Sequence, residues 1–228
     1  MRGGEKGRNM SSRWIRWITL FSVIALSSCG GSDGGVGGTG ISTITGNVAA
    51  SGSTTADIEE LMGIVITIRG TEFRTMTDEH GNFTLEGEFD GQLTLDFRER
   101  DGSAAALPVE VPSAGLVSLR NVRFNLGQAE PDQIELTFEA HVISDPDCND
   151  PAGSVEVSDT QSQTEFLLQI DANTQFESES GCPPNAECSD LMQLTTIKID
   201  GTLVDGDTID ANRIRLVTCR PPGRGRLG

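Results

Sequence analysis

Residues 197–214 read IKIDGTLVDGDTIDANRI, and this stretch decides the fold class. Apolar and polar side chains alternate over residues 197–203 and again over residues 209–217, which is the period of a β-strand with one buried face. Asp205-Gly206 lies between the two runs and favours a tight hairpin turn. The stretch therefore predicts two antiparallel strands that belong to a larger sheet.

The same period occurs upstream of this hairpin. Alternating runs at residues 136–142, 155–157 and 166–170 bring the number of strands expected in residues 131–219 to five. In the first of these runs, Leu136 and Phe138 share one face of the strand. Five short strands in a segment of this length predict a small OB-like β-barrel.

Residues 41–127 show similar alternation in shorter runs, which predicts a β-sandwich and makes the whole folded part all-β. The alternation changes phase near Arg120, which predicts a β-bulge. Gln128-Ala129-Glu130-Pro131 is expected to be a short linker between the sandwich and the barrel. Only residues 55–62 (TADIEELM) favour a helical turn.

Both regions resemble known families. Residues 170–176 (IDANTQF), Asp190-Leu191 and residues 197–214 follow in the order found in the bacterial domain of unknown function 5666. The usual V-G-D after D-L is replaced here by Met-Gln-Leu at residues 192–194. That family has no assigned biochemistry, so the resemblance implies a fold and leaves function open.

Residues 44–48 (ITGNV), 63–68 (GIVITI) and 77–85 (TDEHGNFTL) resemble the motifs of the carboxypeptidase regulatory-like, prealbumin-like sandwich. In that family the third motif marks a hairpin. The resemblance implies a non-catalytic, seven-stranded module. This chain differs from the family in a long acidic insertion between the first two motifs.

The first 28 residues are typical of an export signal: basic residues, an apolar run at residues 18–26, then Leu26-Ser27-Ser28-Cys29. The apolar run is shorter than the ~20 residues that a membrane-spanning helix needs. The final four residues resemble the lipobox of bacterial lipoproteins, in which the cysteine is diacylated and becomes the new N-terminus. The resemblance implies a lipid anchor of palmitate type on Cys29; the alternative is an ordinary signal peptide with a chance cysteine.

Residues 29–40 are rich in glycine and predict a flexible tether between the lipid and the folded part. Gly30 stands where an aspartate would resemble an inner-membrane retention signal, which favours the outer membrane, facing the periplasm or the exterior. At the other end, residues 220–228 are basic and predict a disordered tail that could pair with the acidic body or with a partner.

Without residues 1–28 the chain keeps 12 basic and 33 acidic residues, a net charge of −21. Such a charge repels nucleic acid and disfavours adsorption to anionic lipid. The remaining 200 residues contain no tryptophan or tyrosine, so the exposed rings on which sugars and single-stranded nucleic acids stack are also missing. We therefore expect no nucleic-acid partner.

Four cysteines other than Cys29, namely Cys148, Cys182, Cys188 and Cys219, all belong to the barrel region. In an exported chain an even number of cysteines predicts two disulfides, with three possible pairings. We expect Cys182–Cys188 with Cys148–Cys219, at one end of the barrel. The competing interpretation is a four-thiolate zinc site, which the absence of a Cys-x2-Cys pair disfavours.

One pattern predicts a metal site. Asp145, Asp147, Asn149 and Glu156 occupy positions 1, 3, 5 and 12 of a calcium-loop pattern. Against calcium, position 6 is Asp150 in place of the glycine that permits the sharp turn. The alternative is an acidic, proline-bent loop without metal.

No nucleophile elbow, phosphate loop or zinc-protease motif is present, and the two histidines, His80 and His141, are expected in a solvated turn and on the polar face of a strand. The sequence thus predicts no enzyme and no required cofactor. It predicts a membrane-anchored envelope lipoprotein that binds an extracytoplasmic protein or matrix partner. The alternative is a calcium-assisted enzyme, or an enzyme accessory subunit, with an unrecognised acidic site.

Overall fold

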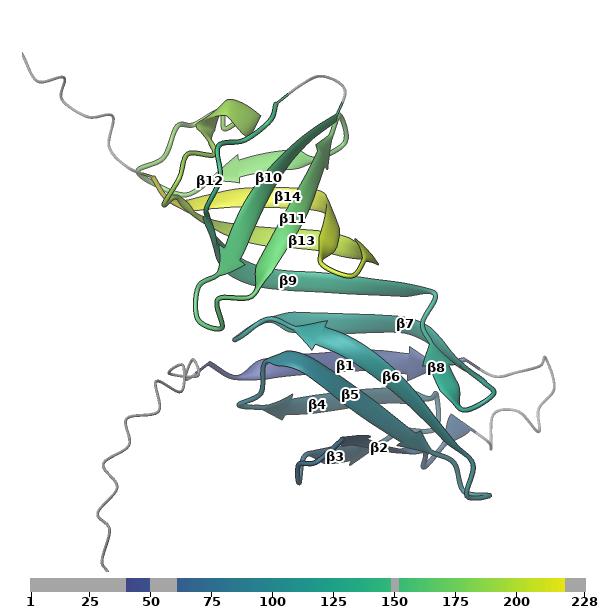
Figure 1. Ribbon diagram of the computed structural model, residues 1–228. Helices are drawn as coiled ribbons and strands as arrows, with labels where there is room; N and C mark the ends of the chain where they lie inside the picture. The colour runs from purple at the N-terminus through teal and green to yellow at the C-terminus, as the bar shows by residue number, and fades with distance from the viewer. Residues whose placement is uncertain (1–39, 50–60, 149–151, 220–228) are drawn as a thin grey trace, which may run out of the picture. The chain divides into compact units, whose positions relative to one another are not determined.

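The computed structural model describes residues 40–49, 61–148 and 152–219 (Figure 1). Fourteen strands and one short 3-10 helix make up the described chain, so the all-β prediction is confirmed. The strands form a two-layer region from residue 41 to about residue 130, followed by a barrel. No helix in this described part is long and apolar enough to cross a membrane.

The first layer of the two-layer region is built around the N-terminal strand. Strand β1 (Ser42–Val48) pairs antiparallel with β4 (Asn82–Gly87) and parallel with β7 (Leu116–Asn125). The register of the β1–β7 pair shifts between Gly46 and Val48, where Asn121 has a φ of +51°. The bulge expected near Arg120 is therefore confirmed.

The second layer has the order β3-β2-β5-β6-β8. Its strands are β2 (Val65–Ile68), β3 (Arg74–Met76), β5 (Gly91–Arg98), β6 (Ala104–Val111) and β8 (Gln128–Glu130). Alternate residues of β5 and β6 are buried, so one face of this layer packs inward.

Phenylalanines join the two layers. The ring of Phe97 on β5 is fully buried and lies 5.9 Å from the ring of Phe83 on β4 and 5.5 Å from that of Phe124 on β7. Gly46 faces the Phe83 ring so closely that a Cβ at this position would lie 2.7 Å from a ring carbon. The glycine of the ITGNV motif is therefore a packing requirement.

The turn at Asp78 joins the layers and corrects one expectation. Asp78 Oδ1 accepts hydrogen bonds from the backbone amides of His80 and Asn82. Hydrogen bonds to this carboxylate lower the pKa of Asp78, and the bond from the Asn82 side chain is the largest cause. The motif at residues 77–85 does not form a hairpin, because β3 pairs with β2 in one layer and β4 pairs with β1 in the other. It is a crossing between layers.

The barrel closes with five strand positions in the order β9-β10-β11-β14-β13 and back to β9. Its strands are β9 (Gln133–Val142), β10 (Ala152–Asp159), β11 (Glu165–Asp171), β13 (Thr196–Asp205) and β14 (Thr208–Thr218). A further short strand, β12 (Gln175–Ser178), runs parallel to the end of β14. The hairpin predicted between residues 197 and 217 is the β13–β14 pair.

Alternating apolar residues fill the barrel, as the sequence period predicts. Phe138 and Phe166 are buried with ring centroids 5.0 Å apart. Leu191 is fully buried although it follows the short 3-10 helix Cys188–Asp190 (η1) in the long connection between β12 and β13. Gly201 permits close strand contact, because a Cβ there would lie 2.4 Å from Ile209 Cγ2.

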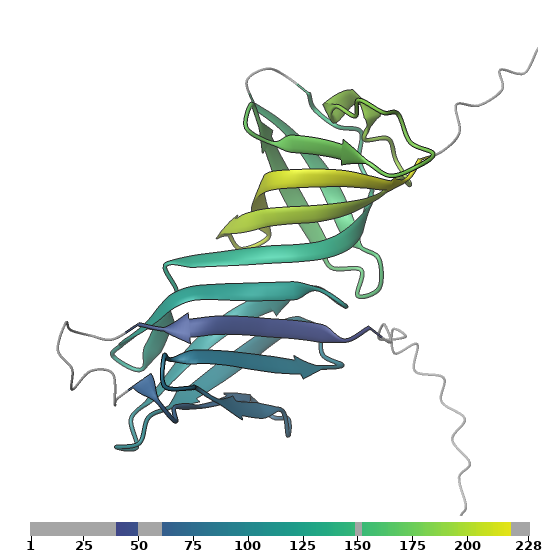
Figure 2. The ribbon, with the colours of Figure 1, turned by 180° about the vertical axis from the view of Figure 1, so that it is seen from behind.

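The two regions share a sheet. Strand β7 pairs antiparallel with β9 from Leu116 opposite Thr137 to Arg120 opposite Gln133. In the view from behind, β4, β1, β7, β9, β13 and β14 follow one another across this sheet (Figure 2). The expected linker is wrong over its first three residues: Gln128–Glu130 is strand β8, which pairs with β7 and β6 at the edge of the second layer.

Candidate functional site

The predicted lipidation site, Cys29, lies outside the described residues, and so do residues 30–39 of the predicted tether. The other four cysteines are all described and lie in the barrel region.

Two disulfides join them, and the pairing differs from the one expected. Cys148 bonds to Cys188, and Cys182 bonds to Cys219. The prediction of Cys182–Cys188 and Cys148–Cys219 is therefore wrong, whereas the prediction of two disulfides is confirmed.

Strand β12 explains the observed pairing. It runs parallel to β14 with Ser178 opposite Leu216, and the amide of Glu179 donates to the carbonyl of Leu216. The chain therefore reaches Cys182 beside the end of β14, where Cys219 follows. Cys188 begins the 3-10 helix and bonds to the connection between β9 and β10 instead.

The calcium-loop residues do not assemble into a metal site among the described residues. Asn149 lies outside them. Asp147 forms an isolated antiparallel bridge with Ser154, and the amide of Glu156 donates to Ser144 Oγ at 2.9 Å. Asp147 and Glu156 thus continue the β9–β10 hairpin, and no group of three His, Cys, Asp or Glu side chains among the described residues could hold a metal.

The two histidines lie in different elements of the fold. His80 is exposed in the Asp78 turn, 3.9 Å from the Glu79 carboxylate. His141 is exposed on β9, and its Nδ1 lies 3.2 Å from Thr196 Oγ1. A hydrolytic triad requires a buried acid that orients the histidine, and the described contacts give His80 only the exposed Glu79 and give His141 only the Thr196 hydroxyl.

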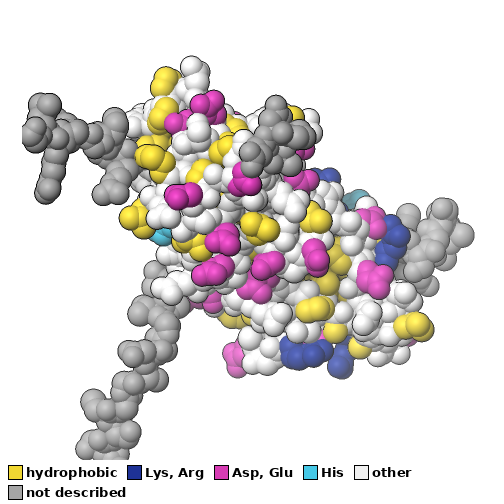
Figure 3. All heavy atoms as spheres, turned by 45° about the horizontal axis from the view of Figure 1, so that its top comes forward, with side chains coloured by type: hydrophobic (Ala, Val, Ile, Leu, Met, Phe, Trp, Pro, Cys, Tyr) yellow, Lys and Arg dark blue, Asp and Glu magenta, His cyan; other side chains and the backbone are white. Residues whose placement is uncertain are grey.

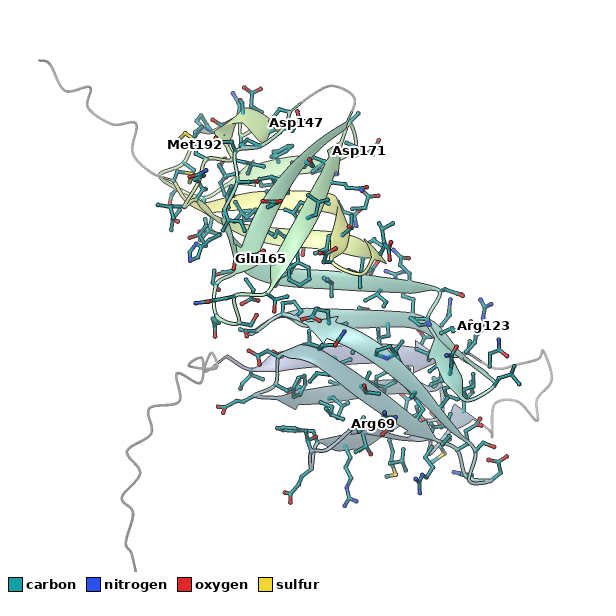
Figure 4. All side chains as sticks on the ribbon, in the orientation of Figure 1. Arg69, Arg123, Asp147, Glu165, Asp171 and Met192 are labelled. Atoms are coloured by element: carbon teal, nitrogen blue, oxygen red, sulfur yellow. A yellow bond between two sulfur atoms is a disulfide. The ribbon has the colours of Figure 1, made fainter. Side chains whose placement is uncertain are left out.

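Figure 4 places the loop residues at the ends of the barrel. Asp147, Asp171 and Met192 lie at the end remote from the two-layer region, whereas Glu165 lies at the opposite end of β11. At the remote end the apolar side chains of Ile143, Met192 and Leu194 are partly exposed. The amide of Leu194 donates to the carbonyl of Val142, which holds this segment against β9.

The outer face of the shared sheet carries most of the paired charges. The barrel region contains only three basic residues between residues 131 and 219, namely Lys198, Arg213 and Arg215, all on β13 and β14. Arg215 donates to Glu177 Oε2 at 2.7 Å and 2.9 Å, which raises the pKa of Arg215. Arg213 lies 3.5 Å from Glu177, so both arginines are largely neutralised locally.

Polar pairing continues across the junction between the regions. Arg120 on β7 lies 2.9 Å from Glu135 on β9, and Gln133 donates to Thr202 on β13 at 3.1 Å. Exposed ion pairs of this kind contribute about 0–1 kcal/mol each. Matched side chains therefore link neighbouring strands across this face.

A cavity of about 460 Å³ opens where β9 leaves β7. It is lined by hydroxyls, including those of Thr43, Thr137 and Thr160, and by Lys198 and Glu139. No sequence motif predicts this cavity, because its lining comes from both regions.

The comparisons with known proteins give no family. No protein-family model and no curated protein matches the chain. The candidate sites therefore stand on their own geometry.

Proposed function

We propose that this chain is an exported lipoprotein, anchored through Cys29, whose β regions act as a non-catalytic binding or structural module for an extracytoplasmic protein or matrix partner. The observation that carries the proposal is the presence of two disulfides in a chain that begins with a lipobox-like export signal. Disulfides persist in oxidising compartments outside the cytoplasm. Signal and cross-links thus support the same location, of which the outer membrane is our preferred choice.

We propose a fold for each of the two regions, and both folds commonly present surfaces to binding partners. The order β9-β10-β11-β14-β13, with the parallel pair β11–β14, supports an OB-like barrel. The parallel β1–β7 pair and the two layers support a prealbumin-like sandwich. We take residues 41–127 and 131–219 as the two modules, and residues 29–40 as the tether.

A binding role is favoured over catalysis by the chemistry of the described residues. Their carboxylates are mostly exposed and engaged in turns or ion pairs, as Asp78, Asp96 and Asp171 are. Contacts of this kind lower the pKa of all three groups, in each case through hydrogen bonds first. A general acid needs the opposite shift, and among the described carboxyl groups a raised pKa is found at Glu110, where burial is the largest cause.

The proposal is tested in the native envelope by comparing the wild type with Cys29→Ala. We expect the wild type in the membrane fraction, and a photo-crosslinker on the folded part to capture a defined protein or matrix component. The variant is expected to leave the membrane fraction or to retain its uncleaved signal. Equal membrane association of the wild type and of a Cys29→Ala form whose signal has been removed, or turnover of a substrate by the purified protein, would contradict the proposal.

A further inference from the structure

Strand β6 has one edge that is only partly covered. Along its whole length it pairs with β5, from Ala104 opposite Arg98 to Val111 opposite Gly91. On its other side the only described strand is β8, which meets it at a single position, Ala106. The amide of Ala106 donates to the carbonyl of Gly127 at 3.0 Å, which shows that its polar groups point toward this second edge.

The backbone groups beyond Ala106 follow from the alternation of a strand. Successive residues direct their amide and carbonyl groups to opposite edges, so Pro108 and Glu110 direct theirs to the same edge as Ala106. No other described strand pairs with either residue there. Because proline lacks an amide hydrogen, the edge offers the Pro108 carbonyl and both backbone groups of Glu110.

A groove runs beside this edge. Its volume is about 610 Å³, and its walls include Pro108, Val109 and Glu110 on one side. On the other side are Leu203, Gly206 and Asp207, at the turn of the β13–β14 hairpin. A space of this size next to an open strand can hold a few residues of extended peptide.

The groove has a negative potential. Glu110 and Asp207 line it, and no Lys or Arg does. Burial raises the pKa of Glu110, and the nearby charge of Asp90 raises it further, although a hydrogen bond from Thr164 has the opposite effect. Figure 3 shows acidic side chains over the middle of the face in view, with the basic side chains toward its margins.

We propose that this groove binds an extended, cationic segment of a partner protein, which adds to the edge of β6 as a short strand and places a Lys or Arg side chain between Glu110 and Asp207. This inference rests on the proposed binding role and names the chemistry of the partner. Backbone hydrogen bonds supply affinity in strand addition, and the side-chain contacts supply selectivity. Nucleic acid is disfavoured because its phosphates would face the same carboxylates.

Strand β14 leads away from the groove at Asp207 through the eleven residues Thr208–Thr218, over roughly 33 Å at the usual rise of a strand. The proposal therefore takes a separate polypeptide as the occupant.

The first experiment uses the full chain in detergent and a fluorescent seven-residue peptide with arginine at alternate positions. Fluorescence anisotropy measures its affinity for the wild type, for Glu110→Lys and for Glu86→Lys. Glu86 is exposed on β4, away from the groove lining, so its substitution makes the same change in net charge. We expect Glu110→Lys to weaken binding at least about five-fold and Glu86→Lys to change it by less than about two-fold. Equal losses would overturn the proposal, since they would show attraction to the overall charge alone.

A second pair of measurements distinguishes the loss of strand addition from the misfolding of a variant. Pro108→Ala supplies the missing edge amide, and we expect it to tighten peptide binding by about two- to ten-fold, the contribution of one backbone hydrogen bond. The same peptide with N-methylated backbone amides should bind more weakly than its parent. Unchanged affinity in both measurements would exclude strand addition. Failure here leaves the capture of a partner in the envelope unaffected, so the groove and the binding role can fail separately.

Discussion

The barrel and the two-layer region are stabilised by different interactions. Both disulfides lie in the barrel, which is also closed so that its five strand positions have no free edge. The two-layer region has no cysteine after Cys29, and among the described strands β3, β4 and part of β6 keep open edges. It depends instead on a phenylalanine-centred core. This difference supports our proposal that the cross-linked region is a rigid support and that a partner strand binds at an edge of the two-layer region.

The largest expected difference appears when both disulfides are removed. Each closes a loop of about forty residues, 40 for Cys148–Cys188 and 37 for Cys182–Cys219. Chain-entropy estimates give about 4 kcal/mol for one such loop, and typical losses are about 2–5 kcal/mol. Hydrogen exchange under reducing conditions should therefore show faster exchange in β9–β14 than in β1–β7. Uniform exchange would mean that the regions unfold as one unit.

A substitution in the core of the two-layer region should destabilise that region more than the barrel. Phe97→Ala removes the fully buried ring that contacts both layers, and we expect the two-layer region to lose about 3–4 kcal/mol of unfolding free energy. Urea unfolding followed by hydrogen exchange measures the loss region by region. Equal destabilisation of the barrel would show that the two regions unfold as one unit.

Thr77→Val should have an intermediate effect. Thr77 is buried, donates to the carbonyl of Leu61 and accepts the amide of Ile64 at 2.9 Å. Valine keeps the shape but leaves both backbone groups without these partners, at a cost of about 1–3 kcal/mol. Thermal unfolding of the variant, with Thr84→Val on the exposed face of β4 as the control, checks this expectation. Similar melting temperatures for the two variants would show that the Thr77 bonds contribute little.

The smallest effect concerns Glu110 and depends on pH. Because the pKa of Glu110 is raised in the folded protein, folding favours its protonated form, and this contribution is lost as the pH rises through the folded pKa. Glu110→Gln should therefore increase stability at pH 7, by less than about 1 kcal/mol because the group is partly exposed. The gain should vanish below the ordinary pKa of glutamate. A gain that persists at low pH would have another cause.

The sequence predicted the features that depend on local alternation of apolar and polar residues. It did not predict the features that depend on contacts between residues distant in the chain. The runs around Ile199 and Phe138 predict the barrel strands because each has one buried face. Strand β12 (Gln175–Ser178) is too short and too polar to show that period, and without it the disulfide pairing could not be derived. The calcium pattern at Asp145 stays a prediction, because Asn149 lies outside the described residues. Linear spacing alone also does not register that Asp147 pairs with Ser154 across a hairpin. The groove beside Glu110 could not be predicted either, since its walls are about 100 residues apart in the chain.

The central claim, an exported and lipid-anchored binding module, is tested most directly by mass spectrometry of the N-terminal peptide of the protein isolated from its native envelope. We predict a peptide that begins at Cys29, carries a diacylglyceryl group on the sulfur and lacks residues 1–28. An unmodified Cys29 within an uncleaved chain would contradict the account.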